Sequence, residues 1–141
     1  MPQILRAETK KDILRCYPVM AQLRPHVAEA DFLPRIERQR QQGYELAFVE
    51  HNGAVVCAAG FRFLENLAWG RFLYVDDLIT AEAVRSRGFA QQLVQWLLAE
   101  AKAKGCDELH LDSGVHRFGA HRFYLGQRMD ITCHHFAIKL K

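Results

Sequence analysis

Arg71-Phe-Leu-Tyr-Val-Asp-Asp-Leu-Ile-Thr80 is a mostly apolar run interrupted by two adjacent acids. Its composition predicts a strand over residues 71–80. A long helix is predicted from about Arg87 to Lys104, because apolar residues recur every four positions from Phe89 to Ala101. A further strand is predicted over residues 108–112, so the order strand–helix–strand implies a right-handed parallel crossover.

The flanking sequence predicts a mixed, mostly antiparallel sheet flanked by helices, which is an α+β fold. A turn at His51-Asn52-Gly53 predicts an antiparallel hairpin. Thr9 is expected to cap the first helix, because its hydroxyl can accept a hydrogen bond from a free backbone N–H. The remaining predicted elements are strands at 3–7, 44–50, 54–63 and 131–139, and helices at 10–20, 29–42 and 119–125.

Composition limits the class of protein. The chain has 141 residues, half of them hydrophobic, and a net charge of +3. This size suits one domain, 1–141, and the slight basic excess argues against nucleic acid as a partner. No apolar run approaches the roughly 18 residues of a membrane helix, and the start lacks a signal-type apolar region. Four dispersed cysteines indicate reduced thiols, so a cytoplasmic location is expected.

The segment Arg85-x-x-Gly88-x-Ala90 lies between the predicted strand and the predicted long helix. The first N–H groups of a helix have no internal partner, and the helix dipole adds positive potential there. Gly88 and Ala90 are small enough for a pyrophosphate to approach the backbone, and Arg85 and Arg87 add positive charge. This arrangement predicts an anion site.

The same three residues resemble the Arg/Gln-x-x-Gly-x-Gly/Ala pattern of the GNAT superfamily, the GCN5-related N-acetyltransferases. Ala120-x-x-x-Tyr124 followed by Gly126 looks like a second segment of the family, with the glycine closer to the tyrosine. The resemblance implies acetyl-CoA in a cleft where the fourth and fifth strands splay apart beside a bulge. Many members carry Asn where this chain has Arg117, and we expect Arg117 to meet a phosphate instead. The cofactor-binding residues that the resemblance implies are Leu78, Ile79, Thr80, Arg85, Arg87, Gly88, Phe89, Ala90 and Arg117.

Three side chains are candidates for proton transfer. Asp76 and Asp77 are expected to accept the proton of a cationic amine before it attacks. Successive strand residues face opposite sides unless a bulge intervenes, so one acid is expected to be the base and the choice stays open. The alternative is that the strand ends at Val75 and both acids are solvated turn residues. Tyr124 is expected to protonate the leaving thiolate, or else to be a core aromatic.

Other residues give weaker signals. Cys133-His134-His135 is a poor metal site, because adjacent strand residues face opposite ways; no metal is expected. A histidine of the last predicted strand, with His135 as a guess, is more plausible in the acceptor pocket. Trp69 is expected to pack, although it could form an aromatic wall of that pocket.

The predicted function is acetyl transfer from acetyl-CoA to a small-molecule or peptide amine by direct attack in a ternary complex. Backbone N–H groups of the bulged strand are expected to stabilise the developing oxyanion. A protein lysine or N-terminal acetyltransferase, a non-catalytic acyl-CoA-binding module, and an unrelated phosphate-binding α/β protein remain alternatives. The last is weakened by the absence of G-x-x-x-x-G-K-[ST] and G-x-G-x-x-G. The oligomeric state stays open, with a homodimer as one candidate.

Overall fold

A computed structural model describes residues 2–141. Its contacts divide the chain into two compact units. The first unit ends at His110, and the second runs from Leu111 to Lys141. Each unit is described by itself.

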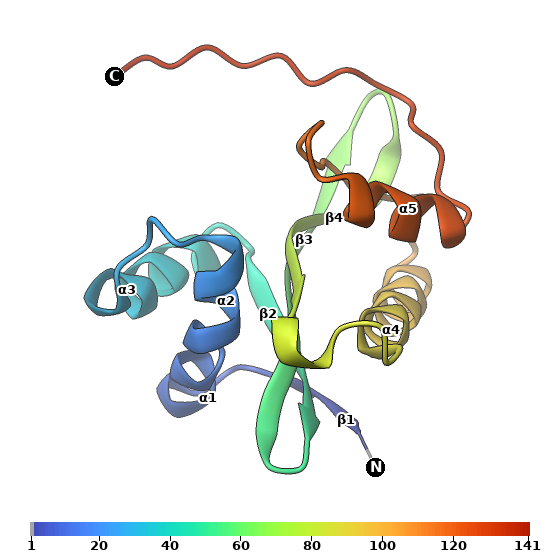
Figure 1. Cartoon of the computed structure of the whole chain (residues 1–141). Helices are drawn as coiled ribbons and strands as arrows, with labels where there is room; N and C mark the ends of the chain where they lie inside the picture. The colour runs from blue at the N-terminus through green and yellow to red at the C-terminus, as the bar shows by residue number, and fades with distance from the viewer. Residues whose placement is uncertain (1) are drawn as a thin grey trace. The chain divides into compact units, whose positions relative to one another are not determined.

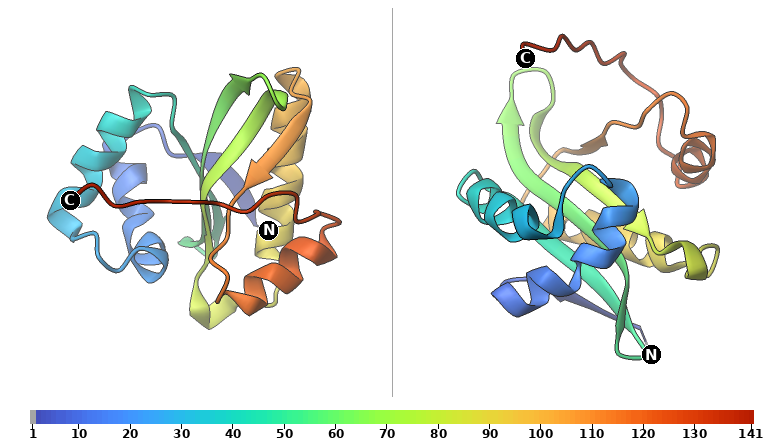
Figure 2. Two further views of the ribbon diagram at one scale, coloured as in Figure 1. Left: turned by 90° about the horizontal axis from the view of Figure 1, so that it is seen from above. Right: turned by 60° about the vertical axis from the view of Figure 1, so that its left-hand side comes forward.

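A five-stranded sheet in the order β1-β2-β3-β4-β5 forms the centre of the first unit. Strands β1 to β4 pair antiparallel, and β5 lies parallel beside β4. The α+β class, the mixed sheet and the predicted parallel crossover are therefore confirmed. Figure 2 shows the long strands β3 and β4 side by side. The strands are β1 (Gln3–Arg6), β2 (Glu45–His51), β3 (Ala54–Asn66), β4 (Gly70–Thr80) and β5 (Glu108–Leu111).

Helices cover both faces of this sheet. Figure 1 shows α1, α2 and α3 on one side and α4 on the other. The repeat that predicted α4 is confirmed, because its buried positions include Phe89, Leu93, Leu97 and Ala101. The helices are α1 (Lys10–Arg15), α2 (Tyr17–Leu23), α3 (Glu29–Arg40), α4 (Phe89–Ala103) and, in the second unit, α5 (Phe118–Gly126), with a 3₁₀ turn η1 (Glu82–Val84).

The first predicted helix is two helices. Thr9 caps α1 as predicted, since its Oγ1 accepts a hydrogen bond from Asp12 N at 3.1 Å. The helix then breaks at Cys16, and Pro18 lies in the first turn of α2. A proline has no N–H to continue the preceding turn, and its ring restricts the residue before it. The break lets α1 and α2 each bury an apolar face, including Ile13 and Met20.

A bulge interrupts the pairing of β4 with β3. Gly60 faces Asp77 and the next residue, Phe61, faces Val75, which leaves Asp76 as the extra residue. A bulge bends the strand and shifts the alternation of its side chains. The bulge implied by the family resemblance is therefore present in the fourth strand, at Asp76.

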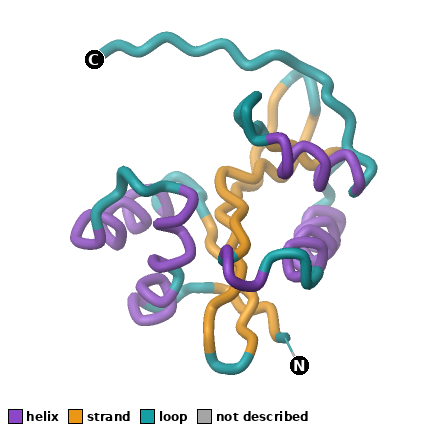
Figure 3. Tube along the Cα trace, in the orientation of Figure 1, coloured by secondary structure: helices purple, strands orange, loops and turns teal. Residues whose placement is uncertain are grey.

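The predicted last strand, 131–139, is wrong. This segment of the second unit is loop (Figure 3), and its apolar residues Phe136 and Ile138 are 91% and 86% exposed. Its composition suits a strand, but a strand forms only where its N–H and C=O groups pair with a neighbour. No strand pairs with it in the described chain.

Candidate functional site

The two acids lie within β4 and line a pocket of about 260 Å³. The bulge at Asp76 explains how two successive strand residues face the same pocket. Asp77 is 15% exposed at its side chain and Asp76 22%, so the alternative that they are solvated turn residues is wrong. The other lining residues are Tyr17, Met20, Ala21, Arg24, His26, Val27, Phe32, Arg35, Ile36, Gln39 and Tyr44.

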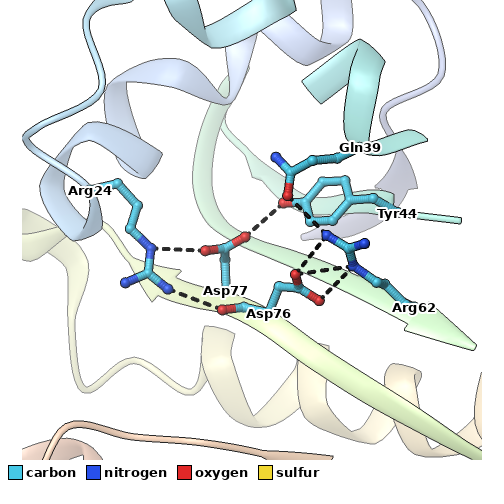
Figure 4. Close-up of polar contacts among 6 residues, drawn as sticks. All are labelled: Arg24, Gln39, Tyr44, Arg62, Asp76 and Asp77. Atoms are coloured by element: carbon cyan, nitrogen blue, oxygen red, sulfur yellow. Dashed lines mark hydrogen bonds and ion pairs between the residues drawn. The ribbon is translucent and has the colours of Figure 1, made fainter. Parts of the chain in front are cut away.

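Asp77 is held from two directions (Figure 4). Arg24 Nε donates to Asp77 Oδ1 at 2.9 Å, and Tyr44 Oη donates to Asp77 Oδ2 at 2.8 Å. Arg24 follows α2, and Tyr44 precedes β2. Both carboxylate oxygens therefore have a donor, and Asp77 links the helical layer to the sheet.

Asp76 has a different set of partners. Arg62 Nε donates to its two carboxylate oxygens at 3.2 and 3.1 Å, and Arg62 Nη2 lies 3.0 Å from Oδ2. Arg62 Nη2 also donates to Gln39 Oε1 at 3.0 Å (Figure 4). Burial raises the pKa of Asp76 above its ordinary value, Arg62 opposes the rise, and the charge of Asp77 adds to it. Asp76 is thus a stronger base than an exposed aspartate.

The phenol of Tyr44 occupies the space that a side chain at position 60 would fill. A Cβ at Gly60 would lie 1.8 Å from Tyr44 Oη, so only glycine leaves room for the phenol. Burial and the charge of Asp77 raise the pKa of Tyr44 well above its ordinary value. The phenol therefore stays protonated at neutral pH and remains a hydrogen-bond donor to Asp77. Arg62 lies over the same ring, 5.5 Å from its centroid.

Leu78, Ile79 and Thr80 follow the acids at the end of β4 and pair with β3. On the other edge, Asp107 N donates to Arg71 O at 2.6 Å, which places β5 beside the beginning of β4. Parallel strands advance at the same rate per residue, so the four-residue β5 ends before Leu78 is reached. Residues 78–80 therefore extend beyond β5.

The Arg85–Ala90 loop connects this strand to α4. Gly88 is the N-cap of α4 with φ +86°, a conformation that favours glycine. No side chain caps the helix, and the first intrahelical bond runs from Gln92 N to Gly88 O. The N–H groups of Phe89 and Ala90 are thus among the helix donors without an intrahelical acceptor. Arg85 and Arg87 are exposed beside them. This geometry fits an anionic ligand.

Three further candidates, Tyr124, Arg117 and His135, lie in the second unit. Tyr124 is a buried residue of α5, and its ring packs edge-on against Phe123 at 5.6 Å. Arg117 is the N-cap of α5. Within its unit His135 contacts Asp112, with Nδ1 3.6 Å from Oδ2. Trp69, in the first unit, stacks on His110 at 3.6 Å and does not line the pocket, as expected for a packing residue.

Sequence reasoning missed four residues that hold the acids: Arg24, Gln39, Tyr44 and Arg62. Each lies at least 14 positions from the acid or arginine that it contacts, so no local pattern could pair them. The acids themselves indicated that such partners exist, because two carboxylates in an apolar strand require positive or hydrogen-bonding side chains nearby. They did not indicate which residues these are.

No helix among residues 2–141 is long and apolar enough to cross a membrane. Within the same range, no three His, Cys, Asp or Glu side chains lie close enough to hold a metal ion. Burial raises the pKa of Cys16 to about 12 and that of Cys57 to about 11, which disfavours a reactive thiolate at either position.

Known proteins resemble this chain over most of its length. The sequence model of the acetyltransferase (GNAT) family matches residues 7–128. An uncharacterised N-acetyltransferase of Bacillus subtilis (strain 168), YhdJ, is 29% identical over 117 residues, which cover 82% of each chain.

Solved structures share the fold. The aminoglycoside N-acetyltransferase AAC(6')-Iy, in complex with CoA, matches with a TM-score of 0.88 at 15% identity, covering 99% of this chain and 94% of the other. A ribosomal-protein-alanine N-acetyltransferase from Brucella melitensis biovar Abortus 2308 matches with a TM-score of 0.82 at 18% identity, covering 99% of each. The family match, which extends over most of the chain, decides the assignment: the chain belongs to the acetyltransferase (GNAT) family and is an N-acetyltransferase of that family, an acyltransferase.

Proposed function

We propose that this protein transfers an acetyl group from acetyl-CoA to an amine by direct attack in a ternary complex. The observation that carries the proposal is the position of the acid pair. Asp76 and Asp77 lie within β4 and line the pocket. The Arg85–Ala90 loop, whose geometry suits an anion, follows the end of the same strand. One strand thus connects a site for an amine with a site for a phosphate-bearing cosubstrate.

The residues of the first unit fit acetyl-CoA. The loop offers helix N–H groups and the charges of Arg85 and Arg87, which suit a pyrophosphate. Residues 78–80 extend beyond β5, so their outer edge suits an extended pantetheine arm bound like an added strand. Arg117 is proposed to meet a phosphate. Acetyl-CoA supplies the acetyl group as a thioester.

Asp76 is the proposed base. An amine is cationic in water and must lose a proton before its nitrogen can attack a carbonyl carbon. Asp76 accepts that proton, directly or through a water, and its raised pKa makes it a better acceptor than an ordinary aspartate. Asp77 is the proposed positioning residue, since its oxygens fix Arg24 and Tyr44 at the wall of the pocket.

Two further groups complete the proposal. Backbone N–H groups of the bulged strand stabilise negative charge that develops on the carbonyl oxygen. Tyr124 protonates the departing thiolate, an assignment carried by its place in the Ala120-x-x-x-Tyr124 segment. No covalent acyl-enzyme is required, because the amine nitrogen itself forms the new bond to the acetyl carbon as the bond to sulfur breaks.

The experiment is an acetylation screen with two readouts. The protein is incubated with acetyl-CoA and with small amines, short peptides or intact proteins. Released CoA thiol and the gain of one acetyl group in mass are both measured. Acetylated small amines support the proposal, whereas acetylation of peptide or protein amines alone supports a protein acetyltransferase. If acetyl-CoA binds in calorimetry but nothing is acetylated, a non-catalytic acyl-CoA-binding module is the better interpretation.

A further inference from the structure

We propose that the amine acceptor also carries an anionic oxygen group, a carboxylate or a phosphate, and that Arg35 binds that group at the rim of the acid pocket. The inference rests on the proposed function, because it names the class of acceptor for the same site. It depends on the charges of the side chains that line the pocket, on the hydrogen-bond partners of the Arg35 guanidinium and on the apolar part of the lining.

The charge balance comes first. Two carboxylates alone would make the pocket acidic and suited to a polycationic amine. Both are already compensated, because Arg24 and Tyr44 hold Asp77 and Arg62 holds Asp76. A second ammonium group on the acceptor would therefore find no carboxylate without a partner in this pocket. The pocket can receive one amine, at the acid that serves as base, and it offers no surplus of negative charge.

Arg35 differs from the other arginines around the pocket. It lies on α3, is exposed, and lines the pocket together with its helix neighbours Phe32 and Ile36. Among residues 2–141 its guanidinium has no hydrogen bond and no ion pair, in contrast to Arg24 and Arg62. A guanidinium presents parallel N–H donors that match a carboxylate or phosphate. The guanidinium of Arg35 is thus available to a ligand in this pocket.

Part of the pocket lining is apolar. Phe32, Ile36 and Met20 are buried, and Val27 is half-buried, and all line the pocket. The volume of about 260 Å³ is at the small end for ligand sites, so it suits a small molecule. The acceptor that fits carries an ammonium group, an anionic group and a small apolar part. Small zwitterionic amines have this chemistry.

The test compares amines that differ only in the anionic group. One set is L-phenylalanine, L-phenylalaninamide and 2-phenylethylamine. The second is phosphoethanolamine with ethanolamine, and spermidine serves as the polycation. Acetylation is followed as kcat/KM at fixed acetyl-CoA. We expect the carboxylate or the phosphate member to exceed its matched neutral amine by about tenfold, the usual scale for one charge-assisted contact. Whichever set shows the preference identifies the anionic group.

Two variants of α3 separate the role of Arg35 from general charge. Arg35→Gln is expected to lower kcat/KM of the anionic amine by about tenfold, through KM, and to leave its neutral partner unchanged. Arg38→Gln is the matched control, since Arg38 is exposed on the same helix and does not line the pocket. It is expected to change neither rate.

The outcomes distinguish this inference from the proposed function. Preferred acetylation of the neutral amines or of spermidine overturns the inference while acetyl transfer stands. An equal effect of Arg35→Gln on all amines, or no effect, also overturns it. If nothing is acetylated, the proposed function fails, and melting temperatures measured with the same amines decide the inference. Stabilisation by the anionic amines in the wild type but not in Arg35→Gln supports it, and the absence of such a difference overturns it.

Discussion

The acid pocket and the Arg85–Ala90 loop follow each other along the chain, and they are held in different ways. In the pocket, each oxygen of the two carboxylates accepts a hydrogen bond from a side chain at least 14 positions away in the sequence. In the loop, residues 85–88 are exposed, and Arg85 Nε donates a hydrogen bond to Thr80 O at 3.3 Å.

This difference indicates which step of the reaction each region affects, cofactor binding or chemistry. Side chains fixed by several partners can place a base with little reorganisation, which favours the chemical step. Helix N–H groups without an intrahelical acceptor and exposed arginines attract an anion and add affinity. We therefore expect changes in the loop to appear as lost binding of acetyl-CoA, and changes in the pocket to appear as lost turnover.

The largest effect is expected for Gly88→Glu. The substitution puts a negative charge beside the helix N–H groups and a side chain at φ +86°. Calorimetry should show no measurable binding of acetyl-CoA. Gly105→Glu is the matched control, because Gly105 follows the other end of α4 with φ +72° and, like Gly88, has open space around it. Equal affinity of a folded Gly88→Glu protein would remove the loop from the cofactor site.

Tyr124→Phe is expected to lower kcat by about a hundredfold with little change in affinity for acetyl-CoA. A general acid acts only in the transition state, and such groups usually contribute a factor of this size. The measurement is kcat beside the calorimetric Kd, with chemistry shown to be rate-limiting. Unchanged turnover would return Tyr124 to a packing role.

Asp77→Asn is expected to lower kcat by about tenfold and to lower the melting temperature. The amide can still accept a hydrogen bond from Tyr44 or Arg24, but it loses the charge that strengthens both bonds. Thermal unfolding and steady-state rates measure the two effects. A hundredfold loss of kcat without a change in stability would instead make Asp77 the base.

Tyr44→Phe has the smallest expected effect. It keeps the buried ring and removes the hydrogen bond to Asp77, so the free energy of unfolding should fall by about 2 kcal/mol, the range for a bond to a charged group. Urea unfolding measures it. In a double-mutant cycle with Asp77→Asn the two losses should be less than additive, and strict additivity would show that the two residues are not coupled.

The loop and the pocket also differ in how well the sequence predicted them. The loop depends on local order, since a strand, a glycine and an amphipathic helix follow one another, and all three were predicted. The pocket depends on contacts between distant positions, such as Arg24 with Asp77 and Tyr44 with Asp77. The acids themselves were identified because charge is costly in an apolar strand.

Two features of the molecule depend on strand pairing, which local sequence does not determine. The placement of both acids on one pocket follows from the bulge at Asp76, and the register of β3 with β4, not the residue type, determines it. The segment 131–139 has a composition that suits a strand but no pairing partner in the described chain. Composition predicts the tendency to form a strand, whereas pairing decides whether it forms.

The pH dependence of kcat for wild type, Asp76→Asn and Asp77→Asn tests the central claim most directly. As pH falls through the raised pKa of Asp76, the base becomes protonated, so the acidic limb of the wild type should lie above the ordinary aspartate range. Asp76→Asn should bind acetyl-CoA, lose about a hundredfold or more in kcat, lack that limb and recover partly at high pH, where free amine is abundant. Asp77→Asn should keep the limb. A wild-type rate and profile in Asp76→Asn would contradict the account, because the proton would then leave through another group.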